Sequence, residues 1–452
     1  MWSPFFKMNP NIFQSLAVPG TDEISEILVK RIDQQKQAVG IVVGVIEPTG
    51  RRIVAYGNLA KGDPGNVDGD TIFEIGSISK VFTSLLLADM VNRNDLALDD
   101  PAAKYLPEHV RMPERSGKPI TLLDLATHSS GLPSAPGNMN RKDPANPYAD
   151  YSVDDLYEFL SGYTLPRDPG SEVEYSNLGA GLLGHMLSYR AGTDYESLIR
   201  SRITQPLGMP DTGITLSSSQ KQRMATGHNA LLAPVANWDL ATLAGAGALR
   251  SSANDMLTFL EAFLGYKEST LASPMKAMLA VRRPVGKTMF DIGLGWSILG
   301  EIAWHDGGTG GFRSFIGYDP KARVGVVALS NAFTLSGVDD IAMHLLNPNA
   351  PLGNLDPPEQ HTGILGDPTL LDRYTGRYQL PDRILEITRK GERLFAQVTA
   401  VGGKPIAGPV FEMFAESESI FFVKVTGGRI SFEICSDGRA TSLLCTELAG
   451  SP

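Results

Sequence analysis

Ser77 and Lys80 are the residue pair in this sequence that is best suited to chemistry. They follow a short apolar run over 71–76 and precede the stretch 81–90, whose apolar residues recur at helical spacing. Residues three apart share one face of a helix, so the serine hydroxyl and the lysine amine would be neighbours at the start of this helix. A lysine can take a serine proton when burial lowers its pKa, and free N–H groups at a helix start can stabilise an oxyanion. The pair therefore predicts a serine nucleophile with a lysine base.

The Ser-x-x-Lys spacing is not specific by itself, because it occurs twice more in the chain. Ser218 and Lys221 lie in a polar Ser/Gln run, and Ser273 is followed directly by Pro274. Only Ser77 stands at the junction of a strand-like run and an apolar helix. A helix-capping serine followed by a surface lysine is the structural alternative for any single match.

The composition is that of an ordinary globular protein. The 452 residues are 42% hydrophobic and 20% charged, which suits one large domain and a smaller one. The net charge of −10 argues against nucleic acid and anionic membrane surfaces as partners. No segment approaches about 18 uninterrupted apolar residues, so no membrane span is expected. Residues 1–14 lack an apolar run of signal-peptide length, which predicts a cytoplasmic protein, or a periplasmic one if a signal was removed.

The order of strand-like and helical segments predicts an α+β fold. Strand patterns occur near both ends of the first 346 residues, with helical patterns between them. The strand patterns cover 41–46, 52–56, 292–298, 301–304, 312–318 and 324–329. We therefore expect an antiparallel sheet whose first and last strands pair, flanked by helices. Residues 134–149 are rich in Pro, Asn and Asp, which predicts an exposed loop.

The C-terminal part is predicted to form a separate domain. Residues 347–369 are rich in Pro and Gly and are typical of a linker, which leaves 1–346 as the first domain. Residues 370–452 hold several short strand-like runs, which predict a small all-β, barrel-like domain. Turn signals separate these runs at Lys390-Gly391, Gly427-Gly428 and Asp437-Gly438. This domain could cap the site, mediate self-association into a homo-oligomer or bind a ligand, and its sequence does not choose among these roles.

Two further motifs follow the Ser77 segment. Tyr175-Ser176-Asn177 stands immediately before a helical pattern over 178–189, although a plain turn before a helix is its structural alternative. His305-Asp306-Gly307-Gly308 opens a glycine run on a late strand, and such a run lets a strand approach a ligand closely. His361-Thr362-Gly363 competes with it as a third motif, but it lies in the Pro-rich linker. We therefore favour His305.

In this order and context, the three motifs resemble those of the serine β-lactamase and penicillin-binding-protein superfamily. The resemblance is strongest to class C β-lactamases, DD-carboxypeptidases, D-aminopeptidases and related esterases. It covers roughly residues 24–346. The supporting stretches are 73–77, 127–133, 206–209 and 305–312.

The resemblance implies a role for each residue. Ser77 would be the acylated nucleophile, and Lys80 would activate it. Tyr175 would exchange protons with the nucleophile and the leaving group, its phenolate being stabilised by neighbouring cations. Asn177 would hold Lys80 and bind the acyl side of the substrate. The backbone N–H groups of Ser77 and Gly308 would form the oxyanion hole.

The third motif departs from the family's pattern. His305 stands where many relatives carry lysine, and Asp306 follows it. In relatives, the lysine and threonine of this motif bind the carboxylate of the substrate, which Asp306 should repel. His305, Gly307 and Gly308 would line the substrate site. The leading hypothesis is a serine hydrolase that cleaves small carboxylic esters through an acyl-enzyme on Ser77, with weak β-lactam hydrolysis as a side activity.

Two alternatives stay open. One is a D-amino-acid peptidase or amidase, or a DD-carboxypeptidase, acting on cell-wall-type peptides. The other is a non-catalytic protein that binds penicillin-like ligands without turnover. In each case the partner is a small-molecule ester, amide or β-lactam. No cofactor is implied, and no metal site is expected, because no His/Cys/Asp cluster has ligand spacing.

Overall fold

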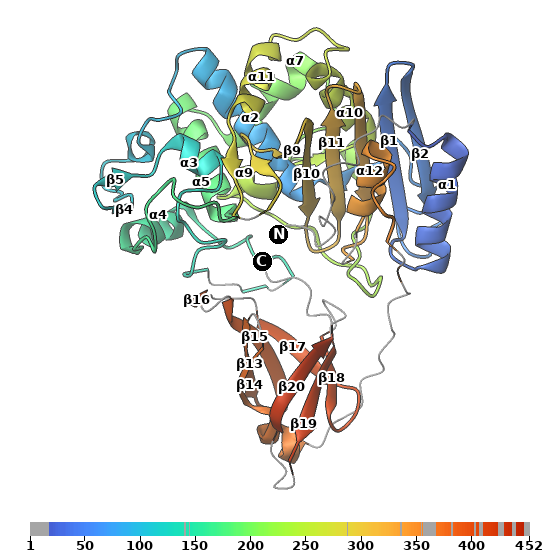
Figure 1. Ribbon diagram of the computed structural model, residues 1–452, viewed down its shortest axis with the longest axis vertical. Helices are drawn as coiled ribbons and strands as arrows, with labels where there is room; N and C mark the ends of the chain where they lie inside the picture. The colour runs from blue at the N-terminus through green and yellow to red at the C-terminus, as the bar shows by residue number, and fades with distance from the viewer. Residues whose placement is uncertain are drawn as a thin grey trace.

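An eight-stranded antiparallel sheet forms the centre of the larger body of the molecule (Figure 1). The computed structural model describes residues 18–139, 142–143, 145–286, 288–334, 337–353, 355, 368–380, 383–401, 404–405, 410–423, 429–435 and 440–446. The strand order is β2-β1-β12-β11-β10-β9-β8-β7. β1 (Gly40–Glu47) lies beside β12 (Val324–Ser330), so the predicted pairing of the first and last strands is confirmed. β1 also forms a hairpin with β2 (Gly50–Gly57).

Helices cover both faces of this sheet, as predicted. Alternate residues of β1 point to opposite faces, so Val42 joins one buried core and Ile41 joins another. α10 (Ala253–Phe263) packs against β1 and β12 in the first core. α12 (Asp339–Leu346) covers β11 and β12 in the second core, which also includes α1 (Thr21–Val29). The α+β class is therefore confirmed.

α2 (Ser79–Asn92) is the central helix, and a 3₁₀ turn over Gly76–Ile78 leads into it. Every residue of this helix from Ser79 to Met90 is buried. Phe82 stacks on Phe259 of α10 with ring centroids 4.4 Å apart. A helix that is apolar on all sides belongs inside a large domain, so the segment that carries the nucleophile is anchored in the core.

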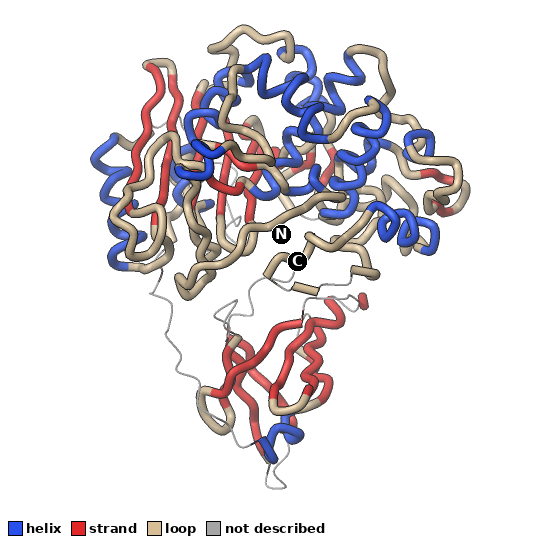
Figure 2. The backbone as a smooth tube through the Cα atoms, turned by 180° about the vertical axis from the view of Figure 1, so that it is seen from behind, coloured by secondary structure: helices blue, strands red, loops and turns tan. Residues whose placement is uncertain are grey.

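The larger body holds further helices and short strands, and Figure 2 shows the helices gathered beside the larger sheet. These helices are α3 (Leu122–Ala126), α4 (Val153–Gly162), α5 (Asn177–Ala191), α6 (Tyr195–Ile199), α7 (Gln205–Leu207), α8 (Ser218–Gln222), α9 (Ala244–Gly247) and α11 (Ala272–Ala280). Two π-helical segments (Lys30–Gln34 and Arg200–Thr204) and a 3₁₀ segment (Ala102–Tyr105) accompany them, and a further 3₁₀ segment (Pro368–Tyr374) packs with the C-terminal strands. The paired short strands are β3 (Phe73–Glu74) with β6 (Arg250–Ser251) and β4 (Glu114–Arg115) with β5 (Lys118–Pro119).

The end of the larger sheet differs from the prediction. The pattern over 292–298 forms two short strands, β8 (Asp291–Ile292) and β9 (Ser297–Leu299), next to β7 (Arg283–Pro284). The chain bends between β8 and β9 because Gly295, with φ +72°, packs tightly against α2. A Cβ atom there would lie 2.9 Å from the carbonyl oxygen of Lys80. β10 (Ile302–Gly308) is longer than predicted, so the third motif lies within the strand, paired with β11 (Arg313–Asp319).

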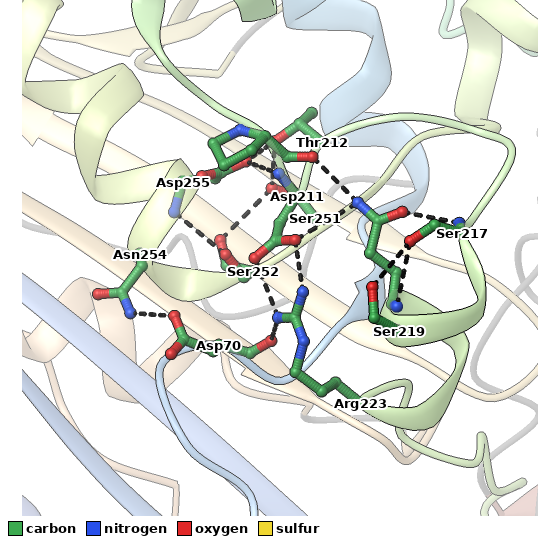
Figure 3. Close-up of polar contacts among 12 residues, drawn as sticks. Asp70, Asp211, Thr212, Ser217, Ser219, Arg223, Ser251, Ser252, Asn254 and Asp255 are labelled. Atoms are coloured by element: carbon green, nitrogen blue, oxygen red, sulfur yellow. Dashed lines mark hydrogen bonds and ion pairs between the residues drawn. The ribbon is translucent and has the colours of Figure 1, made fainter.

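A polar network beside β6 is drawn in Figure 3. The Asp255 carboxylate accepts hydrogen bonds from the backbone N–H of Asp211 at 2.7 Å and from the hydroxyl of Thr212 at 2.8 Å. Thr212 also bonds the Ser251 hydroxyl at 2.8 Å. Burial raises the pKa of Asp255 to about 6. Because Ser251 lies opposite Phe73, the network fixes the strand pair from which the nucleophile segment continues.

The C-terminal strands form a second antiparallel sheet, which curls into an open, barrel-like body in Figure 1. Its path is β13 (Gly376–Gln379), β14 (Arg383–Lys390), β15 (Arg393–Val401), β17 (Val410–Ala415), β18 (Ile420–Phe422), β19 (Arg429–Ile434) and β20 (Ala440–Thr446), with β16 (Lys404–Pro405) paired to β15. A separate buried core fills it. The turn at Lys390-Gly391 is confirmed, with φ +62° at Gly391. The predicted turns at Gly427-Gly428 and Asp437-Gly438, most of the linker, and His361 lie outside the described residues.

No helix in the described parts of the chain is long and apolar enough to cross a membrane.

Candidate active site

Ser77 and Lys80 lie together where the 3₁₀ turn enters α2. The Lys80 amine is 2.8 Å from the Ser77 hydroxyl oxygen. It also lies 2.7 Å from Oδ1 of Asn177 and 2.7 Å from the carbonyl oxygen of Ala246 in α9. The Lys80 side chain is buried, with 2% of the residue exposed. Three elements that are distant in sequence thus converge on one amine.

These three contacts suit Lys80 in either protonation state. A protonated amine has three N–H groups and can donate to all three oxygens. A neutral amine has two N–H groups for the two carbonyl-type oxygens and a lone pair that can accept the Ser77 proton. Burial lowers the pKa of Lys80 to about 7, against the opposing charge of Asp306. At neutral pH a large fraction of Lys80 is therefore able to act as a base.

Tyr175 completes the polar centre. The Lys80 amine lies 4.8 Å from the centroid of the tyrosine ring. Burial raises the pKa of Tyr175 well above its ordinary value of about 10, and a hydrogen bond with Ser77 offsets only part of this rise. The phenol therefore keeps its proton at neutral pH. This state differs from the phenolate that the resemblance implied, and it suits Tyr175 to donating a proton.

Asn177 is the first residue of α5, and a serine cap fixes the start of that helix. Ser176 accepts a hydrogen bond from the N–H of Gly179 at 2.8 Å and donates its hydroxyl proton to the carbonyl of Pro133 at 2.6 Å. Capping of this kind fixes the first helical turn. Asn177 thus lies in contact with Lys80, the residue that the resemblance implies it would hold.

Glycines bring the nucleophile turn and β10 into close approach. A Cβ atom on Gly76, which has φ +49°, would lie 2.7 Å from the backbone N of Gly308. A Cβ atom on Gly307 would lie 3.1 Å from the backbone N of Ser77 and 2.2 Å from the carbonyl oxygen of Ile75. No side chain fits between these backbones. The backbone nitrogens of Ser77 and Gly308 both lie at this close approach, where the resemblance expects an oxyanion hole.

His305 and Asp306 point to opposite faces of β10. His305 is buried, and its ring centroid is 6.4 Å from that of Tyr175. Its Nδ1 lies 2.5 Å from the carbonyl oxygen of Asp306, so this nitrogen carries the ring proton. Burial lowers the pKa of His305 to about 4, so the ring is neutral. Asp306 is half-buried, and no hydrogen bond or ion pair joins its carboxylate to another residue in the described ranges.

The other two Ser-x-x-Lys matches lie on the surface. Ser218 and Lys221 are exposed on α8, and Ser273 is exposed on α11. The structure thus separates Ser77 from the two other matches by burial.

Comparisons with known proteins identify the family of this chain. A family model described as Beta-lactamase matches residues 26–346. The chain belongs to the β-lactamase family. It is 30% identical over 340 residues to the D-alanyl-D-alanine-carboxypeptidase/endopeptidase AmpH of Escherichia coli (strain K12), which covers 70% of this chain and 86% of that protein.

Two further relatives extend the comparison. Penicillin-binding protein 4* of Bacillus subtilis (strain 168) is 26% identical over 404 residues, covering 83% of this chain and 85% of that protein. A solved β-lactamase/D-alanine carboxypeptidase from Yersinia pestis, complexed with citrate, superposes with a TM-score of 0.64 at 26% identity. That match covers 73% of this chain and 97% of the other. This member of the β-lactamase family is thus a β-lactamase-like serine hydrolase.

Three residues near the site of this hydrolase were not singled out from the sequence. His128 is buried against Tyr175, with ring centroids 4.5 Å apart. Glu74 accepts a hydrogen bond from the backbone N–H of Trp238 at 3.0 Å. Arg313 on β11 lies directly opposite Gly308 on β10. His128 and Glu74 lie in the stretches 127–133 and 73–77, and these positions are the signal that could have pointed to them.

Proposed function

We propose that this hydrolase cleaves small carboxylic esters through an acyl-enzyme on Ser77. Neutral Lys80 takes the Ser77 proton as the serine oxygen attacks the ester carbonyl carbon. The N–H groups of Ser77 and Gly308 stabilise the negative oxygen that forms. Tyr175 gives its proton to the departing alkoxide and regains one from Lys80. Water then attacks the acyl carbon while Lys80 takes a proton from it; the bond to the Ser77 oxygen breaks, Lys80 returns the proton to that oxygen, and the acid is released.

The observation that carries the ester preference is the half-buried carboxylate of Asp306. Its charge raises the pKa of Lys80 and of Tyr175, so its field reaches the reacting groups. The neighbouring His305 is neutral and brings no positive charge. A substrate carboxylate bound here would be repelled, whereas an ester without a charge would not. Weak β-lactam hydrolysis fits the same site as a side activity.

A DD-carboxypeptidase or D-amino-acid peptidase is the second candidate, and Arg313 favours it. This arginine is the diagonal neighbour of Asp306 across β10 and β11. Its Nη1 lies 3.3 Å from the place that a Cβ atom on Gly308 would occupy. Its Nη2 contacts Asp339 at 2.5 Å, which neutralises part of its charge. Arg313 could nevertheless receive a terminal carboxylate, and the similarity to AmpH supports such a substrate.

A comparison of kcat/KM for two substrates distinguishes the two candidate functions. We would measure kcat/KM for p-nitrophenyl butyrate and for an acylated D-Ala-D-Ala peptide, with Asp306→Asn beside the wild type. The proposal predicts that the wild type prefers the ester. It also predicts that Asp306→Asn raises kcat/KM for the peptide by about tenfold, or about 1.4 kcal/mol, because one repelling charge is lost. Asp319→Asn, at the far end of β11, is the matched control and should change neither value.

A wild type that cleaves the peptide faster than the ester would overturn the ester proposal in favour of the peptidase. Binding of both substrates without turnover would favour the non-catalytic alternative.

We also propose that residues 1–346 form the hydrolase domain, that 347–369 link it to the remainder, and that 370–452 form the C-terminal domain. All the site residues, from Ser77 to Gly308, lie in the first of these. Self-association through the C-terminal domain and a cytoplasmic or periplasmic location remain predictions.

A further inference from the structure

His128 has a backbone conformation that is uncommon for residues other than glycine. It follows α3 with φ +57°, in the left-handed region that favours glycine and asparagine. The residue is buried, with 4% of its surface exposed. Non-glycine residues persist in this region only where the surrounding structure holds them. The contacts of His128 are therefore of interest.

These contacts hold the segment around Tyr175 from both sides. The N–H of Glu174 donates to the carbonyl of His128 at 2.7 Å. The N–H of Ser176 donates to Nδ1 of the His128 ring at 3.2 Å. Between these two bonds, the rings of Tyr175 and His128 lie 4.5 Å apart at an angle of 34°. One residue thus fixes the backbone before and after the tyrosine and packs against its ring.

The Ser176 bond also defines the state of the His128 ring. Because Nδ1 accepts this proton, it carries none of its own, and the neutral ring has its proton on Nε2. Burial lowers the pKa of His128 well below its ordinary value, and the charge of Lys80 adds to this. The ring therefore stays neutral and keeps its acceptor. Protonation would remove the bond to Ser176.

We propose that His128 is a positioning residue that holds the Tyr175 phenol at the distance from Ser77 and Lys80 that proton transfer needs. It acts through Tyr175 and does not touch the substrate. This inference rests on the proposed role of Tyr175. Small displacements of a proton donor lower the rate of the chemical step. Substitution of His128 is therefore expected to lower kcat and to leave KM unchanged.

Three substitutions separate the parts of this contact. His128→Asn keeps an acceptor near the position of Nδ1 and tolerates the left-handed backbone. His128→Phe keeps a ring but has no acceptor, and His128→Ala has neither. We expect kcat for p-nitrophenyl butyrate to fall by about 10- to 100-fold in the Phe and Ala variants, with KM unchanged. We expect the Asn variant to stay within about threefold of the wild type.

The matched control is His185→Ala. His185 contacts the Tyr157 hydroxyl at 2.7 Å, so it is a second histidine–tyrosine pair, and it lies outside the site. This variant should keep the wild-type kcat. Melting temperatures of all variants would show which ones are folded. If His128→Ala does not fold, the comparison of the Asn and Phe variants carries the test.

A double-mutant cycle with Tyr175→Phe tests whether His128 acts through the tyrosine. The proposal predicts that His128→Ala lowers kcat no further once Tyr175 has lost its hydroxyl. Equal kcat in the Asn and Phe variants, or losses that multiply in the cycle, would overturn the inference while the role of Tyr175 stands. Full activity of Tyr175→Phe alone would overturn the role of Tyr175 and this inference with it.

Discussion

The protonation state of Lys80 decides whether Ser77 can be activated. The Lys80 amine can form a hydrogen bond with each of its three neighbouring oxygens whether or not it is charged. Neither state therefore leaves the buried amine without a partner. Only the neutral state can take the Ser77 proton. A pKa of about 7 places the change between these states in the physiological range.

We therefore expect kcat/KM for p-nitrophenyl butyrate to rise with pH through about 7 and to be about tenfold below its plateau at pH 6. The sign follows from the role of a base, which works only after it loses its proton. Lys80→Ala should lower kcat/KM by about 10²- to 10⁴-fold. Lys276→Ala, in the exposed Ser-x-x-Lys match, is the control and should keep the wild-type profile. A flat profile from pH 5 to pH 9 would exclude Lys80 as the base.

At the scale of elements, the site depends on the close approach of the nucleophile turn to β10. Gly76 combines φ +49° with a neighbouring backbone, so it meets two requirements that only glycine satisfies together. Gly62 meets only the first, because it has φ +82° and no atom within 4 Å of an added Cβ. Substituting each of these glycines therefore distinguishes the effect of backbone strain from the effect of filling the space between the nucleophile turn and β10.

Gly76→Ala should lower the free energy of unfolding by about 1–3 kcal/mol and kcat by at least about tenfold, because β10 must move away from Ser77. Gly62→Ala should lower stability by about 1 kcal/mol and leave kcat unchanged. Urea titrations and ester hydrolysis would measure both effects. Unchanged kcat in a folded Gly76→Ala variant would mean that the approach of β10 does not matter for the reaction.

The sequence predicted the elements that have a clear period or a cap. The pairing of β1 with β12 and the apolar helix after Ser77 were foreseen from apolar patterns. The break between β8 and β9 was not, because Gly295 bends there to meet α2, a contact that no local pattern encodes. The same limit applies to His128, whose partner Tyr175 is distant in sequence. Contacts between such residues arise from tertiary packing.

At the scale of the whole molecule, the raised pKa of Asp255 makes the stability of the fold depend on pH. Its folded-state pKa of about 6 lies above the ordinary aspartate value of about 4, so the folded state binds a proton more tightly than the unfolded state does. Stability from this group is present below pH 4 and is lost as the pH rises through about 6. The shift of about two pKa units corresponds to about 3 kcal/mol.

Asp255→Asn should remove this pH dependence and leave the protein more stable than the wild type above pH 7. The amide oxygen can still accept the two bonds from Asp211 and Thr212. Chemical denaturation between pH 5 and pH 8 would measure the difference. Asp154→Asn, an exposed carboxylate of α4, is the control and should keep the wild-type slope. A variant that is less stable than the wild type at pH 8 would contradict the assignment.

Intact mass of the protein after brief exposure to p-nitrophenyl butyrate tests the central claim most directly. We predict a gain equal to one butyryl group, located on Ser77 by peptide mapping, together with release of p-nitrophenol. Ser77→Ala should show no gain, and Ser273→Ala, the matched control, should behave as the wild type does. A butyryl adduct that persists in Ser77→Ala, or that maps to another residue in the wild type, would contradict an acyl-enzyme on Ser77.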